Sequence, residues 1–248
     1  MAVYASYGID ITMNDETVNA LSQGGYKLYG FRAVKSTTAN GRPLTWFKTS
    51  NYAKKTEITW EKVFGAFTSK STIIDGGKIE ASNSYPIDLG QKLVVEEPTG
   101  TGHVEKEGTA GAISIVNRTT TRFTSGIAQE SRVGGATTLN PLCAFPLYGN
   151  NLNMFVPVEK VLLLFASTPI DTGVVIERSF GPGILVDLTE AESRSVTYHI
   201  DEGWGPPMRY GRPSSAGRQY RGVADRTQPR TFAGSGTRSA GEVASTPG

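Results

Sequence analysis

Apolar and polar residues alternate with a period of two along much of the chain, which is the pattern of β-strands with one buried face. In the segment 55–69, KTEITWEKVFGAFTS, Ile58 and Trp60 share one face. Lys62 interrupts that face and Val63 interrupts the polar one. We therefore expect strands here whose two faces are both partly covered.

Turn-forming sequences rich in Gly, Pro, Asn and Asp recur at short intervals, among them TANGRP, IDGGK, SNSYP, EPTGTG, YGNN and FGPG. Between them lie short runs such as KLVVEE, GAISIVN, NMFVPV and SVTYHI. Many strands spaced by roughly 8–12 residues are typical of a β-sandwich or barrel. The runs VLLLFAS and GILVDL have no polar face, so we expect them in the middle of the sandwich.

One segment carries a helical signal, MNDETVNALSQGG at 13–25. Asn14 can cap the helix, Asp15 and Glu16 suit its positive end, and Gly24 can stop it. The pattern lacks the alternating helices of a parallel α/β sheet. The predicted fold is all-β, an antiparallel β-sandwich with one short N-terminal helix and a low-complexity C-terminal arm.

The periodic pattern ends near residue 202, so we predict a β-sandwich domain at 1–202 and an Arg/Gly/Pro-rich tail or arm at 203–248. The tail holds nine glycines, five prolines and few aliphatic residues, too few to offset the entropy of ordering. It carries seven arginines against two acids, a net +5. Because the whole chain is +2, the first 202 residues carry −3, and such asymmetry is typical of an interaction arm.

Four arginines lie close together in the stretch RYGRPSSAGRQYRG of this arm: Arg209, Arg212, Arg218 and Arg221. Interleaved with tyrosines, they could contact phosphates and stack on bases or lipid headgroups. Two other interpretations stay open, a strap that contacts a neighbouring subunit or the sandwich itself, and a charged terminus with no partner.

Candidate catalytic groups are scarce. Cys143 is the single cysteine, so a disulfide within the chain is excluded. We expect Cys143 to be a small buried residue. His103 and His199 are the two histidines and lack neighbours at metal-ligand spacing. No serine lies in a G-x-S-x-G elbow, and no glycine-rich stretch continues as G-K-[ST]. We expect a non-enzymatic protein without cofactor or metal, while a hydrolase site assembled from distant strands stays open.

The longest apolar run, VLLLFA, is too short to cross a bilayer, and the first residues show no secretory signal. We therefore expect a soluble protein that is cytoplasmic or released by a non-classical route. The sequon NRT at Asn117 is a glycosylation acceptor only in a secreted protein.

Aromatic residues next to turn sequences are the candidate ligand contacts: Trp46, Tyr85, Tyr148 and Trp204. Such rings can stack on sugars or headgroups, and they can equally serve as packing anchors.

The stretches GAISIVNRTTTRFTSGIAQ and KVLLLFASTP resemble the sandwich core of membrane-binding β-pore cytolysins and their lectin relatives. The resemblance covers a minor part of the chain and includes no diagnostic motif, and NDETVNALSQGG is more polar than a membrane-inserting helix. It implies membrane or sugar recognition without assigning the family.

The leading interpretation is a binding protein that recognises carbohydrate or lipid headgroups through loops of a β-sandwich. The alternative is a self-assembling structural protein, coat-like or filamentous, whose arm ties subunits into a homo-oligomer or binds nucleic acid.

Overall fold

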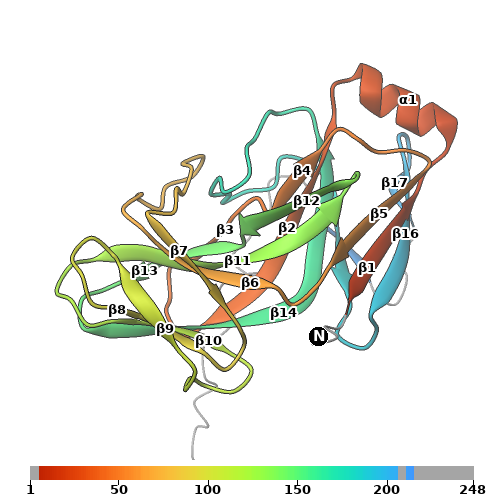
Figure 1. Ribbon diagram of the computed structural model, residues 1–248. Coiled ribbons are helices and arrows are strands. Elements are labelled where there is room, and N and C mark those ends of the chain that lie inside the picture. The colour runs from red at the N-terminus through yellow and green to blue at the C-terminus, as the bar shows by residue number, and fades with distance from the viewer. Residues whose placement is uncertain (1–5, 206–210, 215–248) are drawn as a thin grey trace, which may run out of the picture.

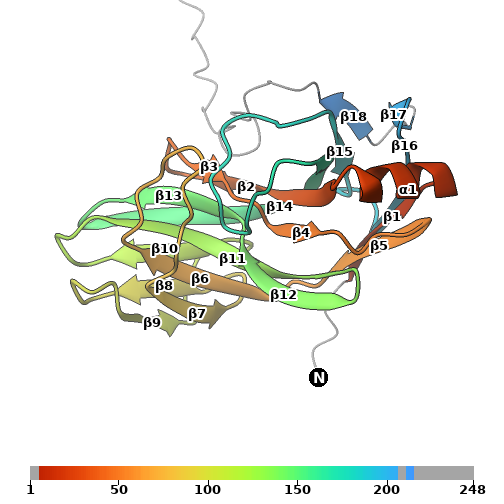
Figure 2. The same cartoon turned by 90° about the horizontal axis from the view of Figure 1, so that it is seen from above.

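Two β-sheets pack against each other in the computed structural model of the protein, and the main hydrophobic core lies between them (Figure 1, Figure 2). The structure describes residues 6–205 and 211–214. One short helix, α1 (Asp15–Gln23), accompanies the sheets. The all-β fold with a single short N-terminal helix, predicted from the period of two, is confirmed.

The first sheet has ten strands: β1 (Tyr7–Thr12), β3 (Arg42–Pro43), β5 (Lys55–Trp60), β6 (Phe64–Ser69), β7 (Asn83–Ile87), β11 (Phe123–Val133), β12 (Ala136–Pro141), β13 (Cys143–Leu147), β16 (Ser193–His199) and β17 (Gly203–Trp204). Its main path is β17-β16-β1-β5-β11-β13-β3. Strands β12 and β6 also pair with β11, and β7 pairs with β6.

The second sheet has eight strands: β2 (Lys27–Ser36), β4 (Phe47–Thr49), β8 (Lys92–Val95), β9 (Gly102–Glu105), β10 (Ile113–Asn117), β14 (Asn151–Ala166), β15 (Gly183–Asp187) and β18 (Gly211–Ser214). Its main path is β18-β15-β14-β10-β8-β9, with β2 paired to β14 and β4 to β2. Strand β18 comes from the Arg-rich segment and pairs through its backbone with β15.

Both sheets are mixed. Most neighbouring strands are antiparallel, as predicted, but β1 pairs with β16 and β8 with β10 in parallel. Ile11 lies opposite Val196, so the two ends of the sandwich sequence meet in one sheet. Parallel neighbours require long connections, and the alternation of apolar residues carries no information about pairing direction.

The helix follows its sequence signals. The Asn14 side chain accepts a hydrogen bond from the Thr17 amide at 2.8 Å, and the Gly24 amide donates to the Ala20 carbonyl at 2.9 Å. Leu21 is fully buried against the core. None of the helices in the described part of the chain is long and apolar enough to cross a membrane.

Strand β14 shows why VLLLFAS has no polar face. Leu163 and Phe165 point into the core between the sheets, whereas Leu162 and Leu164 belong to a second cluster on the opposite face. That cluster is completed by residues of the 167–182 segment, including Ile176. The predicted central position of this strand is confirmed.

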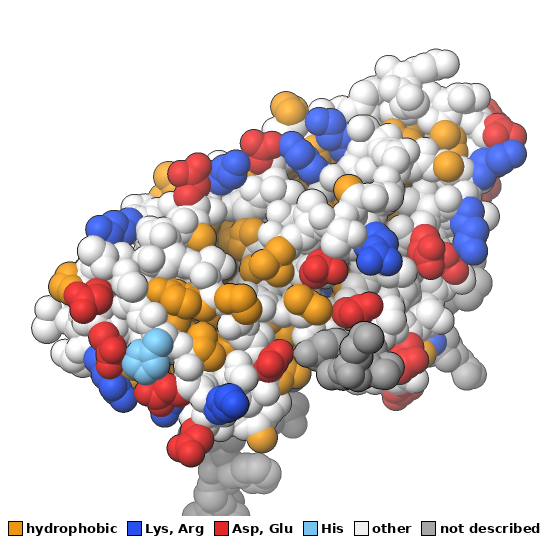
Figure 3. Space-filling model, viewed as in Figure 1, with side chains coloured by type: hydrophobic (Ala, Val, Ile, Leu, Met, Phe, Trp, Pro, Cys, Tyr) orange, Lys and Arg blue, Asp and Glu red, His pale blue; other side chains and the backbone are white. Residues whose placement is uncertain are grey.

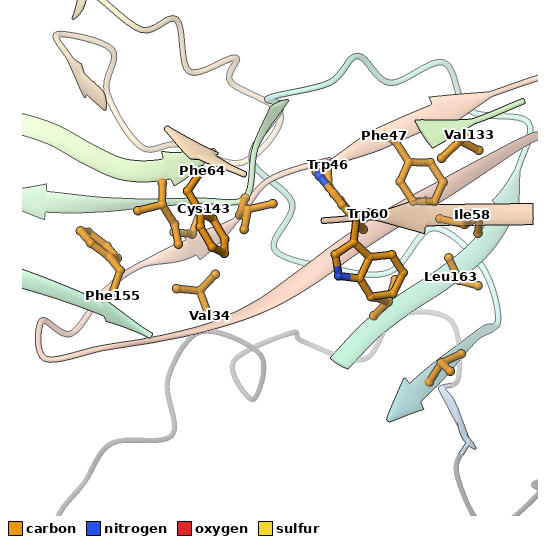
Figure 4. Packing of buried hydrophobic residues seen from close by; sticks show 14 of the residues in the cluster. Val34, Trp46, Phe47, Ile58, Trp60, Phe64, Val133, Cys143, Phe155 and Leu163 are labelled. Carbon is orange, nitrogen blue, oxygen red and sulfur yellow. The ribbon is translucent and has the colours of Figure 1, made fainter. Parts of the chain in front are cut away.

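Large side chains from both sheets fill the main core, as Figure 4 shows for ten labelled residues: Val34, Trp46, Phe47, Ile58, Trp60, Phe64, Val133, Cys143, Phe155 and Leu163. Cys143 is buried as expected. Burial raises the pKa of its thiol to about 12, so the thiol is not a nucleophile near neutral pH.

Candidate functional site

Three loops meet at the end of the sandwich that carries β8, β9 and β10: residues 96–101, 118–122 and 148–150. Asn117, at the end of β10, joins two of them. Its Nδ2 donates to the carbonyls of Thr121 (2.7 Å) and Tyr148 (3.1 Å). Its Oδ1 accepts from the amide and the hydroxyl of Thr119, at 3.0 and 2.8 Å. Every hydrogen-bonding position of this buried amide is occupied. We call these three loops with Asn117 the loop platform.

The backbones of two platform loops approach closely. The Asn150 amide donates to the Thr119 carbonyl at 2.8 Å. A Cβ on Gly149 would lie 2.6 Å from the Thr120 carbonyl oxygen, so only glycine fits there. Asn150 adopts a positive φ of 52°, which asparagine tolerates better than most residues. Hydrogen bonding and close packing together fix the position of Tyr148 next to this turn.

Tyr148 is the exposed aromatic residue of the platform, with 44% of its surface accessible. The Arg122 Cζ lies 4.9 Å from the centre of the Tyr148 ring, a cation–π contact. Arg122 is exposed, and no carboxylate of the described residues lies within ion-pair distance of its guanidinium. The platform therefore presents a partly exposed ring with a cation over one of its faces.

A charged cluster includes residues of the 96–101 and 118–122 loops and of the adjoining strands β8 and β9. Arg118 Nη1 is 3.0 Å from Glu96 Oε1, and Lys92 Nζ is 2.7 Å from Glu105 Oε2. The two nitrogens of His103 face Glu96 and Glu105 at 3.3 and 3.2 Å. The hydrogen bond from Lys92 lowers the pKa of Glu105, and His103 and Arg118 add to that effect. Charged and histidine side chains gather at this end of the molecule in Figure 3.

Hydroxyl and amide groups of the 96–101 loop and of strand β7 lie close together. Thr99 and Thr101 place their hydroxyl oxygens 3.1 Å apart, and Asn83 Nδ2 donates to the Thr99 carbonyl at 3.2 Å. The Tyr85 hydroxyl accepts from the Gly102 amide at 2.9 Å. These groups are exposed or half-buried and can offer further hydrogen bonds to a ligand.

The structure brings two of the four candidate aromatic residues to this end and places two elsewhere. Tyr148 belongs to a platform loop, and Tyr85 contacts Gly102, the first residue of β9, directly after the 96–101 loop. Trp46 is fully buried in the core, where its Nε1 donates to the Gln129 carbonyl at 3.0 Å. Trp204 stacks on Phe165 with ring centres 5.5 Å apart and does not reach the platform.

The Arg-rich stretch is described in part. Arg212 belongs to β18, while Arg209, Arg218 and Arg221 lie outside the described residues. Their predicted contact with a polyanion or a subunit stays a prediction.

Sequence reasoning missed the residues that organise the platform. Asn117 attracted notice only as a sequon, yet its amide is buried and fully hydrogen-bonded and thus inaccessible for glycosylation in the folded protein. Arg122 carried no signal of its own. The run of threonines after Asn117 was the available clue, since such residues often bond to neighbouring backbone groups.

Metal-ligating side chains do not converge in the described part of the chain. No three His, Cys, Asp or Glu side chains among residues 6–205 are arranged to hold a metal ion. His199 Nδ1 lies 3.9 Å from Asp201 Oδ2 near the helix end of the molecule.

A second polar centre lies deep between the sheets. Arg32 on β2 is 1% exposed, and its Nη2 lies 2.8 Å from Glu159 Oε2. A register shift between Val158 and Val161 of β14 brings Glu159 to this position. The Arg32 Cζ lies 4.8 Å from the Trp60 ring centre and 5.6 Å from that of Trp46.

The charge of Arg32 is incompletely hydrogen-bonded. Its Nε and Nη1 have no hydrogen-bond partner among the described residues. Burial lowers the pKa of Arg32, and the charge of Glu159 opposes that shift. The aromatic faces supply part of the missing stabilisation, so we interpret this centre as structural.

Comparison of the chain with protein-family models, with curated proteins and with solved structures gave no match.

Proposed function

We propose that this protein binds carbohydrate through the loop platform. The observation that carries the proposal is the exposed Tyr148 ring, which contacts Arg122 and stands on loop backbone that Asn117 fixes in place. Sugar-binding sites need a rigid aromatic face for the pyranose ring and polar groups for its hydroxyls. Tyr148 offers the ring, and Thr99 and Thr101 of the 96–101 loop offer polar groups, with Asn83 of β7 bonded to the same loop.

Rigidity favours this function. Loops that are already hydrogen-bonded in the free protein lose little entropy when a ligand binds. Asn117 and Gly149 hold the platform in one arrangement without a ligand.

The test is a glycan array followed by calorimetric titration of the hits. We expect binding by the full chain and a loss of about tenfold or more in Tyr148→Ala, because the ring contact is removed. Leu139→Ala is the matched control, since Leu139 is 50% exposed and lies on β12. Equal binding by the full chain and Tyr148→Ala would reject the platform as the site.

The second candidate is self-assembly, and strand β18 favours it. Four residues of the Arg-rich segment add an edge strand to the eight-stranded sheet by pairing with β15. The same edge of one copy can accept this strand from another copy. Light scattering on the full chain and on a chain ending at Gly205 tests this: assembly of the full chain alone supports it, and two monomers reject it.

A further inference from the structure

Arg122 is the platform cation that has not already been neutralised. Arg118 and Lys92 each pair with a glutamate, Glu96 and Glu105 respectively. The guanidinium of Arg122 contacts the Tyr148 ring and has no carboxylate of the described residues within ion-pair distance. Its N–H edges are therefore available to a ligand.

The contact with the ring also orders Arg122. A guanidinium resting on an aromatic face keeps its N–H fork in the plane of the stack, where it can bind a carboxylate through two parallel hydrogen bonds. Tyr148 is itself fixed through its carbonyl by Asn117. The backbone that carries the ring is thus held in place, and the ring contact restricts the Arg122 guanidinium before any ligand arrives.

We propose that the ligand is a saccharide bearing a carboxylate, of the uronic or sialic acid class, with the carboxylate on Arg122 and the sugar ring against the part of the Tyr148 ring that the guanidinium leaves exposed. This inference rests on the proposed function and specifies its substrate class.

The surrounding charges favour a single carboxylate over an anionic membrane. Binding to an anionic bilayer draws on several unpaired cations, each of which contributes a small amount. Here the cations beside Arg122 are paired, and Glu96, Glu97 and Glu105 lie on the adjoining loop and strand. The single guanidinium of Arg122, which acts at short range, can bind one carboxylate on an otherwise neutral sugar.

The experiment compares matched charged and neutral probes by calorimetry: a galacturonate trisaccharide against its methyl ester, and sialyllactose against lactose. We expect the full chain to bind at least one acid about 10- to 100-fold more tightly than its neutral partner, the range of a charge-assisted hydrogen-bonded pair. Arg122→Gln should abolish this preference, and Arg122→Lys should retain part of it. Arg178→Gln is the control, an exposed arginine on the 167–182 segment.

The outcomes separate the two proposals. Equal affinity for neutral and acidic glycans would overturn the carboxylate inference but would still support carbohydrate binding. A preference for acids that survives Arg122→Gln would overturn the role of Arg122. Binding to phosphatidylserine vesicles but to no saccharide would overturn both.

Discussion

The loop platform and the Arg32 centre both bury a polar side chain in the sandwich, but they satisfy it differently. Asn117 makes four hydrogen bonds to loop groups and leaves none of its positions open. Arg32 makes one ion pair, leaves two nitrogens unpaired and rests against two tryptophan rings. A neutral amide can be satisfied completely by nearby backbone, whereas a buried charge needs a partner brought from another strand.

The two centres have different roles in the molecule. The Asn117 hydrogen bonds position the solvent-facing loops 118–122 and 148–150. Their loss should therefore change the arrangement of the exposed side chains of these loops. The Arg32 centre links β2 of one sheet to Trp60 of the other, so its loss should change the stability of the whole sandwich. Substitutions at each centre separate the two roles.

Glu159→Ala should destabilise the protein most, by about 3–5 kcal/mol, because it leaves the Arg32 charge buried and unpaired. Urea unfolding measures the change in free energy. The control is Glu177→Ala, which removes the partner of Arg42 at a similar distance of 2.7 Å in a pair that is about one-third exposed. That control should cost about 1 kcal/mol or less.

The double variant Arg32→Met with Glu159→Ala sharpens the first prediction. It removes both charges and should recover most of the stability lost in Glu159→Ala alone. If the double variant is as unstable as the single one, the loss comes from packing around Glu159 and not from an unpaired charge.

Asn117→Ala should cost about 2–3 kcal/mol, because it leaves buried loop groups without partners. Hydrogen exchange should also show faster opening at residues 118–122 and 148–150. Asn151→Ala is the control, since the Asn151 side chain is exposed and accepts a local hydrogen bond from the Leu152 amide. A cost as small as that of the control would mean that the platform does not depend on Asn117.

Local patterns predicted the elements of the fold well. The period of two located the strands, and Asn14, Asp15 and Gly24 predicted the helix ends. The absence of a polar face in VLLLFAS predicted a strand covered on both sides. The residues that cap the helix lie within a few positions of its ends, so the local sequence shows them. The burial of a strand face can be predicted from the apolar pattern of that strand alone.

The site was harder to predict because its parts come from distant segments. Tyr85 of β7 and Tyr148 of the 148–150 loop reach the same end although they are far apart in the sequence. Trp46 stands beside a turn sequence, but its indole bonds to Gln129, 83 residues away, and is buried. Such placements follow from sheet pairing, which the alternation of apolar residues does not specify.

Gly149→Ala should cost about 1–2 kcal/mol, because the added methyl group would collide with the backbone of Thr120. Thermal unfolding and glycan binding measure the two consequences, lower stability and a displaced Tyr148. Gly8→Ala in β1 is the control, since its Cβ would meet neighbours at an ordinary 3.7 Å or more. If Gly149→Ala is neutral and binds normally, the close approach of the two loops is not required.

The smallest effect concerns the residue next to Glu159 in the β14 irregularity. Lys160 pairs with Asp187 of β15 at 2.6 Å, in a pair that is about one-third exposed. Burial acts to raise the pKa of Asp187, but hydrogen bonds from Lys160 and Thr189 outweigh it and lower the pKa to about 2. Since the folded-state pKa lies below the ordinary 3.8, the pair stabilises the protein above about pH 4 and loses that contribution as the pH falls towards 2.

Asp187→Asn isolates this contribution from other acids with lowered pKa values, such as Asp171 and Glu105. The difference in unfolding free energy between wild type and Asp187→Asn should be about 1 kcal/mol or less near neutral pH and should vanish near pH 2. Urea unfolding at a series of pH values measures it. A difference that is independent of pH would mean that the Lys160–Asp187 pair acts through packing. A difference as large as that of Glu159→Ala would remove the contrast between an exposed and a buried ion pair on the same strand.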